Sequence, residues 1–199
     1  MTPIIARTKF LPPRLKSTIL PRPHISQVLC SWKEYPLILV QAEAGYGKTT
    51  AIASFLEQTS PLFIWCTLEE TDTEPWLFVH TMIAALQTVY PRCGQQAHKL
   101  LTTEGEAAML WAIDALANEL CDLMSQETLF VLDNYHLVDC SVINGLMERF
   151  LEHKPLHLHL MLITRQIPAL PSLARWRAYG KVLDLGRQHF AFTPTEIAE

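Results

Sequence analysis

The sequence has no excess of basic residues. Its 199 residues include 16 Lys or Arg and 20 Asp or Glu, which gives a net charge of -4 at pH 7. Proteins that hold a nucleic-acid backbone are usually basic, because much of their affinity comes from neutralised phosphates. We therefore expect that this chain does not bind DNA by itself.

Paired cysteines, a leader segment and a long apolar run are also missing. The five cysteines are scattered and odd in number, which argues against a disulfide framework and against a zinc site of the CxxC type. The N-terminus does not combine a basic start with an apolar stretch, and the apolar runs are much shorter than the roughly 18 residues of a membrane span. These absences predict a cytoplasmic protein that is neither secreted nor inserted in a membrane.

Prolines are distributed unevenly along the chain. Five of the thirteen lie in residues 1–24, where their spacing blocks helix formation and favours an extended N-terminal arm lying on a folded body. The chain is 49% hydrophobic and 18% charged, which suits one globular domain with a sizeable core. We expect that domain to cover residues 25–190.

Apolar runs of strand length alternate with helical segments. Strands are predicted over 36–41, 62–68, 128–132, 157–164 and 181–185, and helices over 48–57, 75–90, 107–124 and from 139 to about 153. Residues 91–107 have no clear pattern. Alternation of this kind implies right-handed crossovers, so the predicted fold class is α/β, a three-layer sandwich with a parallel five-stranded sheet between helices.

The last residues indicate the start of a further helix. Thr193 with Glu196 is a capping-box signature, and Pro194 occupies the first helical position. We expect residues 191–199 to begin a following helical segment. The 199 residues are then expected to be the front of a longer protein.

A glycine-containing turn follows the first predicted strand. Residues 42–50 read AEAGYGKTT, which fits the phosphate-loop pattern GxxxxGK[ST] except that Ala42 stands at the first glycine. Gly45 and Gly47 give the backbone the freedom to turn its amide groups toward a polyanion at the start of a helix. The alternative is a strand-to-helix turn that binds nothing. The buried strand before it and the helix after it favour the phosphate loop and the P-loop NTPase type of sandwich.

Three side chains carry the expected chemistry. Lys48 would place its ammonium by the β- and γ-phosphates, and the Thr49 hydroxyl would hold Mg²⁺. Asp133 ends the apolar run 128–132 about 85 residues downstream, as in a Walker-B strand, whose carboxylate lies by the magnesium site. The alternative for Asp133 is an ordinary strand-end turn residue.

The next residue affects hydrolysis. Many hydrolysing proteins of this architecture have a second acid after the magnesium aspartate, but this chain has Asn134, which cannot take up a proton. General-base help is worth about 10²- to 10⁴-fold in rate, so slow or absent turnover is predicted. Glu43 adds a negative charge inside the loop and would weaken affinity unless it points to solvent.

Two arginines are candidates for nucleotide contact. Arg165, after the fourth predicted strand, would reach the edge of the sheet that holds the phosphate loop, where it could sense a γ-phosphate. Arg22 lies on the proline-stiffened arm and could reach the nucleotide. For both, an ordinary surface role is the competing interpretation.

Four histidines are further candidates for contact with phosphate or a metal ion. His136 follows Asp133 by three residues and either contacts phosphate or caps a helix, so we do not predict it as a ligand. His153, His157 and His159 lie close together in sequence, but no cysteine or acid completes a metal site, which favours solvation at a strand edge.

Three segments together resemble the MalT-like branch of the LuxR-type bacterial transcription activators, which are signal-transduction ATPases of the STAND class. They are residues 42–50 (AEAGYGKTT), 132–137 (LDNYHL) and 190–196 (FAFTPTE). The resemblance covers nearly the whole chain, and Ala42 at the first glycine is habitual in that family. Departures from the family pattern are Glu43 for proline, Asn134 for a second aspartate, and Gln166 for the aspartate that follows Arg165.

The resemblance implies an N-terminal ATP-binding domain. In the full protein a winged-helix segment, a repeat-built sensor and a C-terminal helix-turn-helix domain would follow, and DNA would be bound only through that last domain. ADP would stabilise a resting form, whereas ATP with an inducer would permit self-association and promoter binding. Carried over by position, the nucleotide would be held by Ala44, Gly45, Tyr46, Gly47, Lys48, Thr49, Thr50, Arg22 and Arg165, and Mg²⁺ by Thr49 and Asp133.

The sequence therefore predicts an ATP- or ADP-binding switch domain of a MalT-like regulator, with slow or absent hydrolysis. Two alternatives remain. One is a freestanding P-loop ATPase or kinase, and the other is an interaction module whose nucleotide site has degenerated. Asn134 and the interrupted final helix argue against the first, whereas Glu43 and Asn134 favour the second.

Overall fold

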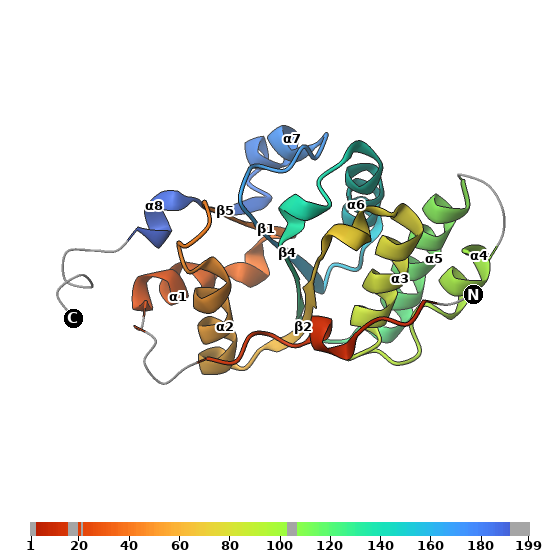
Figure 1. Cartoon of the computed structure of the whole chain (residues 1–199), viewed down its shortest axis with the longest axis horizontal. Coiled ribbons are helices and arrows are strands. Elements are labelled where there is room, and N and C mark those ends of the chain that lie inside the picture. Colours follow the sequence, from red (N-terminus) through yellow and green to blue (C-terminus); the bar gives the residue numbers. More distant parts are fainter. Residues whose placement is uncertain (1–2, 16–19, 21, 103–106, 192–199) are drawn as a thin grey trace.

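A computed structural model describes residues 3–15, 20, 22–102 and 107–191. Its five strands are β1 (Leu37–Gln41), β2 (Leu62–Thr67), β3 (Thr128–Asp133), β4 (Leu158–Thr164) and β5 (Val182–Leu185). They form one sheet in the order β2-β3-β4-β1-β5, and every neighbouring pair is parallel (Figure 1). The predicted α/β class with a parallel five-stranded sheet is confirmed.

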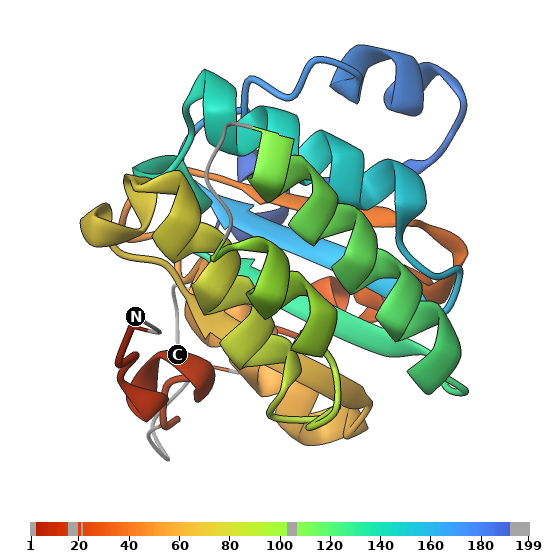
Figure 2. The same cartoon turned by 90° about the vertical axis from the view of Figure 1, so that its right-hand side faces the viewer.

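The helices of the described residues lie on both faces of this sheet. They are α1 (Pro23–Leu29), α2 (Lys48–Thr59), α3 (Pro75–Leu86), α4 (Gln95–Leu100), α5 (Ala107–Leu123), α6 (Ser141–His153), α7 (Leu173–Ala178) and α8 (Arg187–Phe190). Short 3-10 turns are η1 (Arg7–Phe10), η2 (Trp32–Glu34), η3 (Glu70–Thr73) and η4 (Tyr135–Leu137). Figure 2 shows α5 and α6 crossing in front of the sheet, with α3 beside them.

Two cores, one on each face, hold the three layers together. Leu37 and Leu39 of β1 pack into the core with α3, α5 and α6, whereas Ile38 and Val40 pack into the core with α1 and α2. Successive strand residues point to opposite faces, so a strand buried on both faces reads as a continuous apolar run. This is why the apolar runs located the strands from the sequence alone.

Some helix boundaries differ from the sequence expectation. Helix α3 ends at Leu86 rather than near Tyr90, because the backbone N–H groups of Thr88 and Val89 bond carbonyls three residues back instead of four. Helix α4 occupies part of the unpatterned region and starts after Gly94, whose φ of 81° is left-handed. Helices α1, α7 and α8 were not predicted, since four to seven residues are too few to show a reliable helical period.

The predicted N-terminal arm contains one 3-10 turn, η1, and is attached to η3 through Lys9. The Lys9 ammonium lies 2.6 Å from a carboxylate oxygen of Asp72 in η3, and both side chains are buried. Helix α1 begins at Pro23, within two residues of the expected domain start. The capping box at Thr193 and Glu196 lies outside the described residues, so the boundaries 1–24, 25–190 and 191–199 stay predictions.

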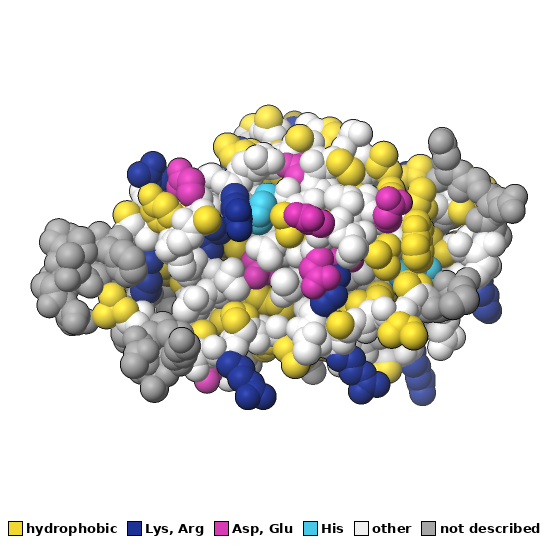
Figure 3. Space-filling model, in the orientation of Figure 1, with side chains coloured by type: hydrophobic (Ala, Val, Ile, Leu, Met, Phe, Trp, Pro, Cys, Tyr) yellow, Lys and Arg dark blue, Asp and Glu magenta, His cyan; other side chains and the backbone are white. Residues whose placement is uncertain are grey.

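In the part of the chain that the structure describes, none of the helices combines the length and the apolar character needed to cross a bilayer. Figure 3 shows Lys and Arg side chains scattered over one face, with Asp and Glu side chains gathered nearer its middle.

Candidate functional site

The loop between β1 and α2 has a conformation that requires glycine at two places. Gly45 has φ 85° and Gly47 has φ 72°, and Gly47 is the residue before the first turn of α2. A residue with a side chain pays about 1–2 kcal/mol for such left-handed geometry. Ala42 is fully buried and does not have a positive φ, which explains how alanine fits at the first position of the pattern.

Lys48 is folded back over this loop. Its ammonium donates to the carbonyl oxygens of Ala42 at 2.7 Å and Glu43 at 2.9 Å, and only 9% of the residue is exposed. Burial lowers the pKa of Lys48, while the carboxylate of Asp133 acts in the opposite direction. The charged ammonium is therefore poorly hydrated and lies against the backbone of the loop.

Thr49 and Asp133 meet directly. The Thr49 hydroxyl donates to Asp133 Oδ1 at 3.1 Å, and the Asn134 backbone N–H donates to the same oxygen at 2.9 Å. Burial raises the pKa of Asp133, and these two hydrogen bonds together with Lys48 oppose that shift. A hydroxyl that donates its proton still has lone pairs to offer, so hydroxyl and carboxylate oxygens together fit a hard cation such as Mg²⁺.

These groups surround one cavity of about 320 Å³ at the carboxyl ends of the strands. Its lining residues are Ala44, Gly45, Gly47, Lys48, Thr49, Thr50, Asp133, Asn134, His136, Ile163, Thr164 and Arg165. Because β4 lies between β1 and β3, its last residues fall between the phosphate loop and Asp133. That strand order is what brings Arg165 to the site.

Two predicted site residues lie elsewhere. Tyr46 does not line the cavity; its ring is half-buried against the core of α1 and α2, with the Arg187 guanidinium 5.5 Å from the ring centroid. Arg22 lies on the outer side of the loop, where it lines a separate cavity of about 190 Å³ with Gly47 and Thr50. Its guanidinium donates to the carbonyl oxygens at positions 190 and 191, at 3.0 and 2.9 Å.

Glu43 faces away from the cavity. Its side chain is 58% exposed, and one carboxylate oxygen lies 3.7 Å from an Arg187 nitrogen. The exposed geometry agrees with the interpretation that Glu43 points to solvent. It places the extra negative charge outside the group of lining residues.

Sequence reasoning left His136 out of the site, but it lines the cavity. Neither ring nitrogen has a hydrogen-bond partner among the described residues. Burial lowers the pKa of His136, and the positive charges of Arg165 and Lys48 lower it further. The only signal in the sequence was its position three residues after Asp133, at the same edge of the sheet.

The other histidines belong to a different environment. His159 is buried, with Nε2 2.6 Å from a Glu127 oxygen and Nδ1 2.8 Å from the Tyr35 carbonyl, and His157 lies 3.0 Å from the same carboxylate. Side-chain solvation at a strand edge was expected, whereas His159 is in fact held inside. Among the described residues, no group of three or more His, Cys, Asp or Glu side chains is placed to hold a metal ion.

Several bacterial regulators resemble this chain over nearly its whole length. It is 36% identical over 188 residues to the HTH-type transcriptional regulator MalT of Serratia proteamaculans, 33% identical over 190 residues to that of Yersinia enterocolitica, and 31% identical over 188 residues to that of Klebsiella pneumoniae. Each match covers 94% of this chain and 20% of the relative. The chain thus spans about a fifth of the length of these relatives. No family model matches the chain.

Solved structures resemble the fold. A chain in the structure of Drosophila ORC bound to AT-rich DNA and Cdc6 gives a TM-score of 0.54 at 12% identity, covering 83% of this chain and 53% of that one. The Aeropyrum pernix ORC1 protein in complex with DNA gives 0.54 at 16% identity, covering 90% and 48%. At these identities the likeness concerns the fold alone, which is that of the P-loop ATPases. The chain is therefore homologous, over nearly its whole length, to a segment of the MalT-type transcriptional regulators that makes up about one fifth of their length. Its fold is that of the P-loop ATPases.

Proposed function

We propose that this chain is the ATP- or ADP-binding switch domain of a LuxR-type, MalT-like transcription regulator of the STAND class. The observation that supports the proposal most is the convergence of Lys48, Thr49 and Asp133 on one cavity beside a glycine turn. This is the arrangement that a Walker A loop and its magnesium aspartate require. Homology to MalT-type regulators supplies the regulatory context.

In this proposal each group has a distinct role. Amides of residues 44–50 and the Lys48 ammonium bind the phosphates, and Lys48 exchanges its two carbonyl partners for phosphate oxygens. Thr49 and Asp133 would hold Mg²⁺, which when bound neutralises charge on the β- and γ-phosphates. Arg165, at the end of β4, is placed to contact the γ-phosphate and so to distinguish ATP from ADP.

Hydrolysis is proposed to be slow or absent. Asn134 lies beside Asp133 in the cavity, where its side-chain amide can position a water molecule but cannot accept its proton. We expect phosphate release well below about 1 s⁻¹, the lower end of common enzyme turnover. Release at that rate or faster would instead favour a freestanding ATPase or kinase.

A cytoplasmic regulator of this kind would self-associate in its ATP form and bind DNA through a separate helix-turn-helix domain. The nucleotide would act by changing how this domain packs against its neighbours. Arg22 lines a separate cavity beside the phosphate loop, and the Tyr46 ring lies against Arg187 rather than in the loop's cavity, which fits an indirect role for both.

A fluorescent-nucleotide titration tests the proposal. Lys48→Ala should weaken binding of a fluorescent ADP analogue at least tenfold, whereas Lys99→Ala, at an exposed site on α4, should leave binding unchanged. Equal binding by the wild type and Lys48→Ala would contradict the proposed site. Mass spectrometry of the nucleotide that co-purifies with the protein would identify the resident ligand.

A further inference from the structure

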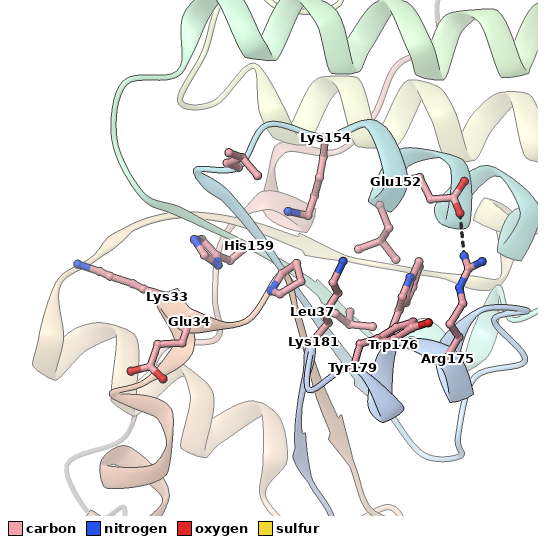
Figure 4. A pocket seen from close by; sticks show the side chains of 13 residues that line it. Lys33, Glu34, Leu37, Glu152, Lys154, His159, Arg175, Trp176, Tyr179 and Lys181 are labelled. Atoms are coloured by element: carbon pink, nitrogen blue, oxygen red, sulfur yellow. Dashed lines mark hydrogen bonds and ion pairs between the residues drawn. The ribbon is translucent and has the colours of Figure 1, made fainter.

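A second cavity lies at the amino-terminal ends of the strands, whereas the phosphate loop lies at their carboxyl ends. It has a volume of about 770 Å³ and is bounded by η2 and the start of β1, the end of α6, and the segment from α7 to β5 (Figure 4). This size is in the usual range for small-molecule sites, about 300–1,000 Å³. Nothing in the phosphate-loop chemistry uses it.

The lining of this cavity is positively charged, although the chain as a whole is negative. Its ionisable lysine, arginine and glutamate side chains are Lys33, Lys154, Arg175, Lys181, Glu34 and Glu152. The two glutamates leave a cationic excess, and Glu152 is already paired with Arg175 at 3.2 Å. Figure 4 shows this pair at one side of the cavity and Lys33 pointing away from the other lining residues. Lys154 and Lys181 are therefore the cations that face the interior.

Lys154 holds a charge that no carboxylate balances. Its ammonium is half-buried and donates to the carbonyl oxygens of Leu158 and, at 3.4 Å, Pro155. Within the described part of the chain it has no ion-pair partner. Burial lowers the pKa of Lys154 to about 8, and the distant charge of Glu127 opposes the shift only in part. An anion beside this ammonium would favour its charged form.

Lys181 faces the same space from the other side. Its side chain enters the cavity opposite Lys154 (Figure 4) and has no hydrogen-bond or ion-pair partner among the described residues. Two ammonium groups from separate elements thus converge on one volume. Convergent donors of this kind are suited to a phosphate or carboxylate group.

Beside these cations the cavity has an aromatic and aliphatic wall. Trp176 and Tyr179 lie next to Lys181, and Tyr179 is 72% exposed. Pro36 and Leu37 line the space between them and η2, and Leu37 is buried. A flat apolar group would be desolvated against this wall while its anionic end reached the lysines.

We propose that this cavity is a second ligand site, one that binds a small organic anion. Lys154 and Lys181 hold its phosphate or carboxylate group, and Trp176 packs against its planar apolar part. This cavity and the phosphate loop lie at opposite ends of the strands, so the organic anion binds independently of Lys48. The inference does not rest on the proposed nucleotide function.

Titration of the whole chain with phenyl phosphate, followed by tryptophan fluorescence and by calorimetry, tests this site. Saturable binding is expected, and Lys154→Met, Lys181→Met and Trp176→Leu should each weaken it at least tenfold. Lys99→Ala, at an exposed site on α4, should bind phenyl phosphate as the wild type does. The Lys154, Lys181 and Trp176 variants should keep wild-type binding of the fluorescent ADP analogue, which separates this cavity from the phosphate loop. Inorganic phosphate should bind at least tenfold more weakly, because it cannot use the aromatic wall. Benzoate in place of phenyl phosphate distinguishes carboxylate from phosphate recognition.

A pH series on the wild type provides a second measurement, with Lys154→Met as its control. Binding of phenyl phosphate to the wild type should weaken as the pH rises through about 8, where Lys154 loses its proton. That pH dependence should be absent in Lys154→Met. Absence of phenyl phosphate and benzoate binding at millimolar concentration, or wild-type affinity in both lysine variants, would overturn the proposal.

Discussion

The ammonium of Lys9 lies 2.6 Å from the Asp72 carboxylate, although 63 residues separate them in sequence. Asp72 is completely buried, and it also accepts hydrogen bonds from the Thr81 hydroxyl at 2.9 Å and the Glu69 backbone N–H at 2.8 Å. These bonds join the N-terminal arm to η3 and α3. Two of these three partners, Lys9 and Thr81, come from other elements of the fold.

Removing Lys9 should destabilise the fold severely. In Lys9→Met the Asp72 charge stays buried without its counter-ion, and breaking a buried pair in this way costs about 3–5 kcal/mol. Urea unfolding measures the loss, with Arg14→Met, an exposed site on the same arm, as the matched control. If both variants unfold at the same urea concentration, the arm does not contribute to stability through this pair.

Much of the architecture could be predicted from the sequence, because β1, β3 and β4 are continuous apolar runs and the phosphate loop is a dense local motif. What escaped prediction depends on contacts between distant residues. Lys9 lies in a proline-rich segment with no periodicity, and nothing local marks Asp72 as its partner. His136 needed the strand order to place it in the cavity, and the approach of Glu127 to His159 needed the β3 and β4 pairing.

Asn134→Asp should accelerate hydrolysis if the proposed nucleotide site is correct. Asn134 has φ 61°, a left-handed conformation that aspartate also tolerates, so the new carboxylate would occupy the same place. We expect phosphate release to rise about 10²-fold or more, the usual contribution of a general base. Asn134→Gly keeps the backbone geometry without an acid and should hydrolyse no faster than the wild type.

Asp133→Asn should separate stability from ligand binding. Burial raises the pKa of Asp133, so the folded protein holds this proton more tightly than the unfolded chain, and the charged form costs stability at pH 7. The amide oxygen of asparagine can still accept from Thr49. We expect the variant to be at least as stable as the wild type at pH 7 and to lose Mg²⁺-dependent nucleotide binding.

The stability difference between these two proteins should depend on pH. As the pH falls toward the ordinary carboxyl pKa, near 4, the wild type takes up its proton and its relative stability rises. Denaturation curves of both proteins from pH 7 to pH 4 measure this convergence. A variant that is less stable than the wild type at pH 7 would show that the buried charge contributes more to stability than it costs.

For Lys154 the expected pH dependence of stability is the opposite, because burial lowers the pKa of its ammonium and the wild type gains stability as the pH rises. Its pKa of about 8 in the folded state lies below the ordinary value of 10.5, so the unfolded chain binds more protons between these limits. Wild-type stability should therefore rise relative to Lys154→Met from pH 8 to 10.5, by roughly 3 kcal/mol in total. Parallel stability profiles for the two proteins would contradict the burial of this ammonium.

Two glycines offer a matched test of local crowding. Gly94 and Gly180 have φ of 81° and 66°, so alanine at either site costs about 1–2 kcal/mol in backbone strain. A Cβ at Gly94 would also lie 2.2 Å from the Ile83 Cγ2, whereas the space at Gly180 is open. We expect Gly94→Ala to lose about 1–3 kcal/mol more than Gly180→Ala in thermal unfolding.

The hydrogen bonds of Arg22 to the carbonyls of Phe190 and Ala191 have a mechanical consequence. His24, two residues after Arg22 and within α1, lies 3.0 Å from the His189 carbonyl, so the start of α1 is joined to the end of α8. Residue 22, just before α1, and residue 191, just after α8, are thus held side by side. A force that pulls residues 22 and 191 apart would break these hydrogen bonds first. It would act on the parallel strands only after the bonds had broken.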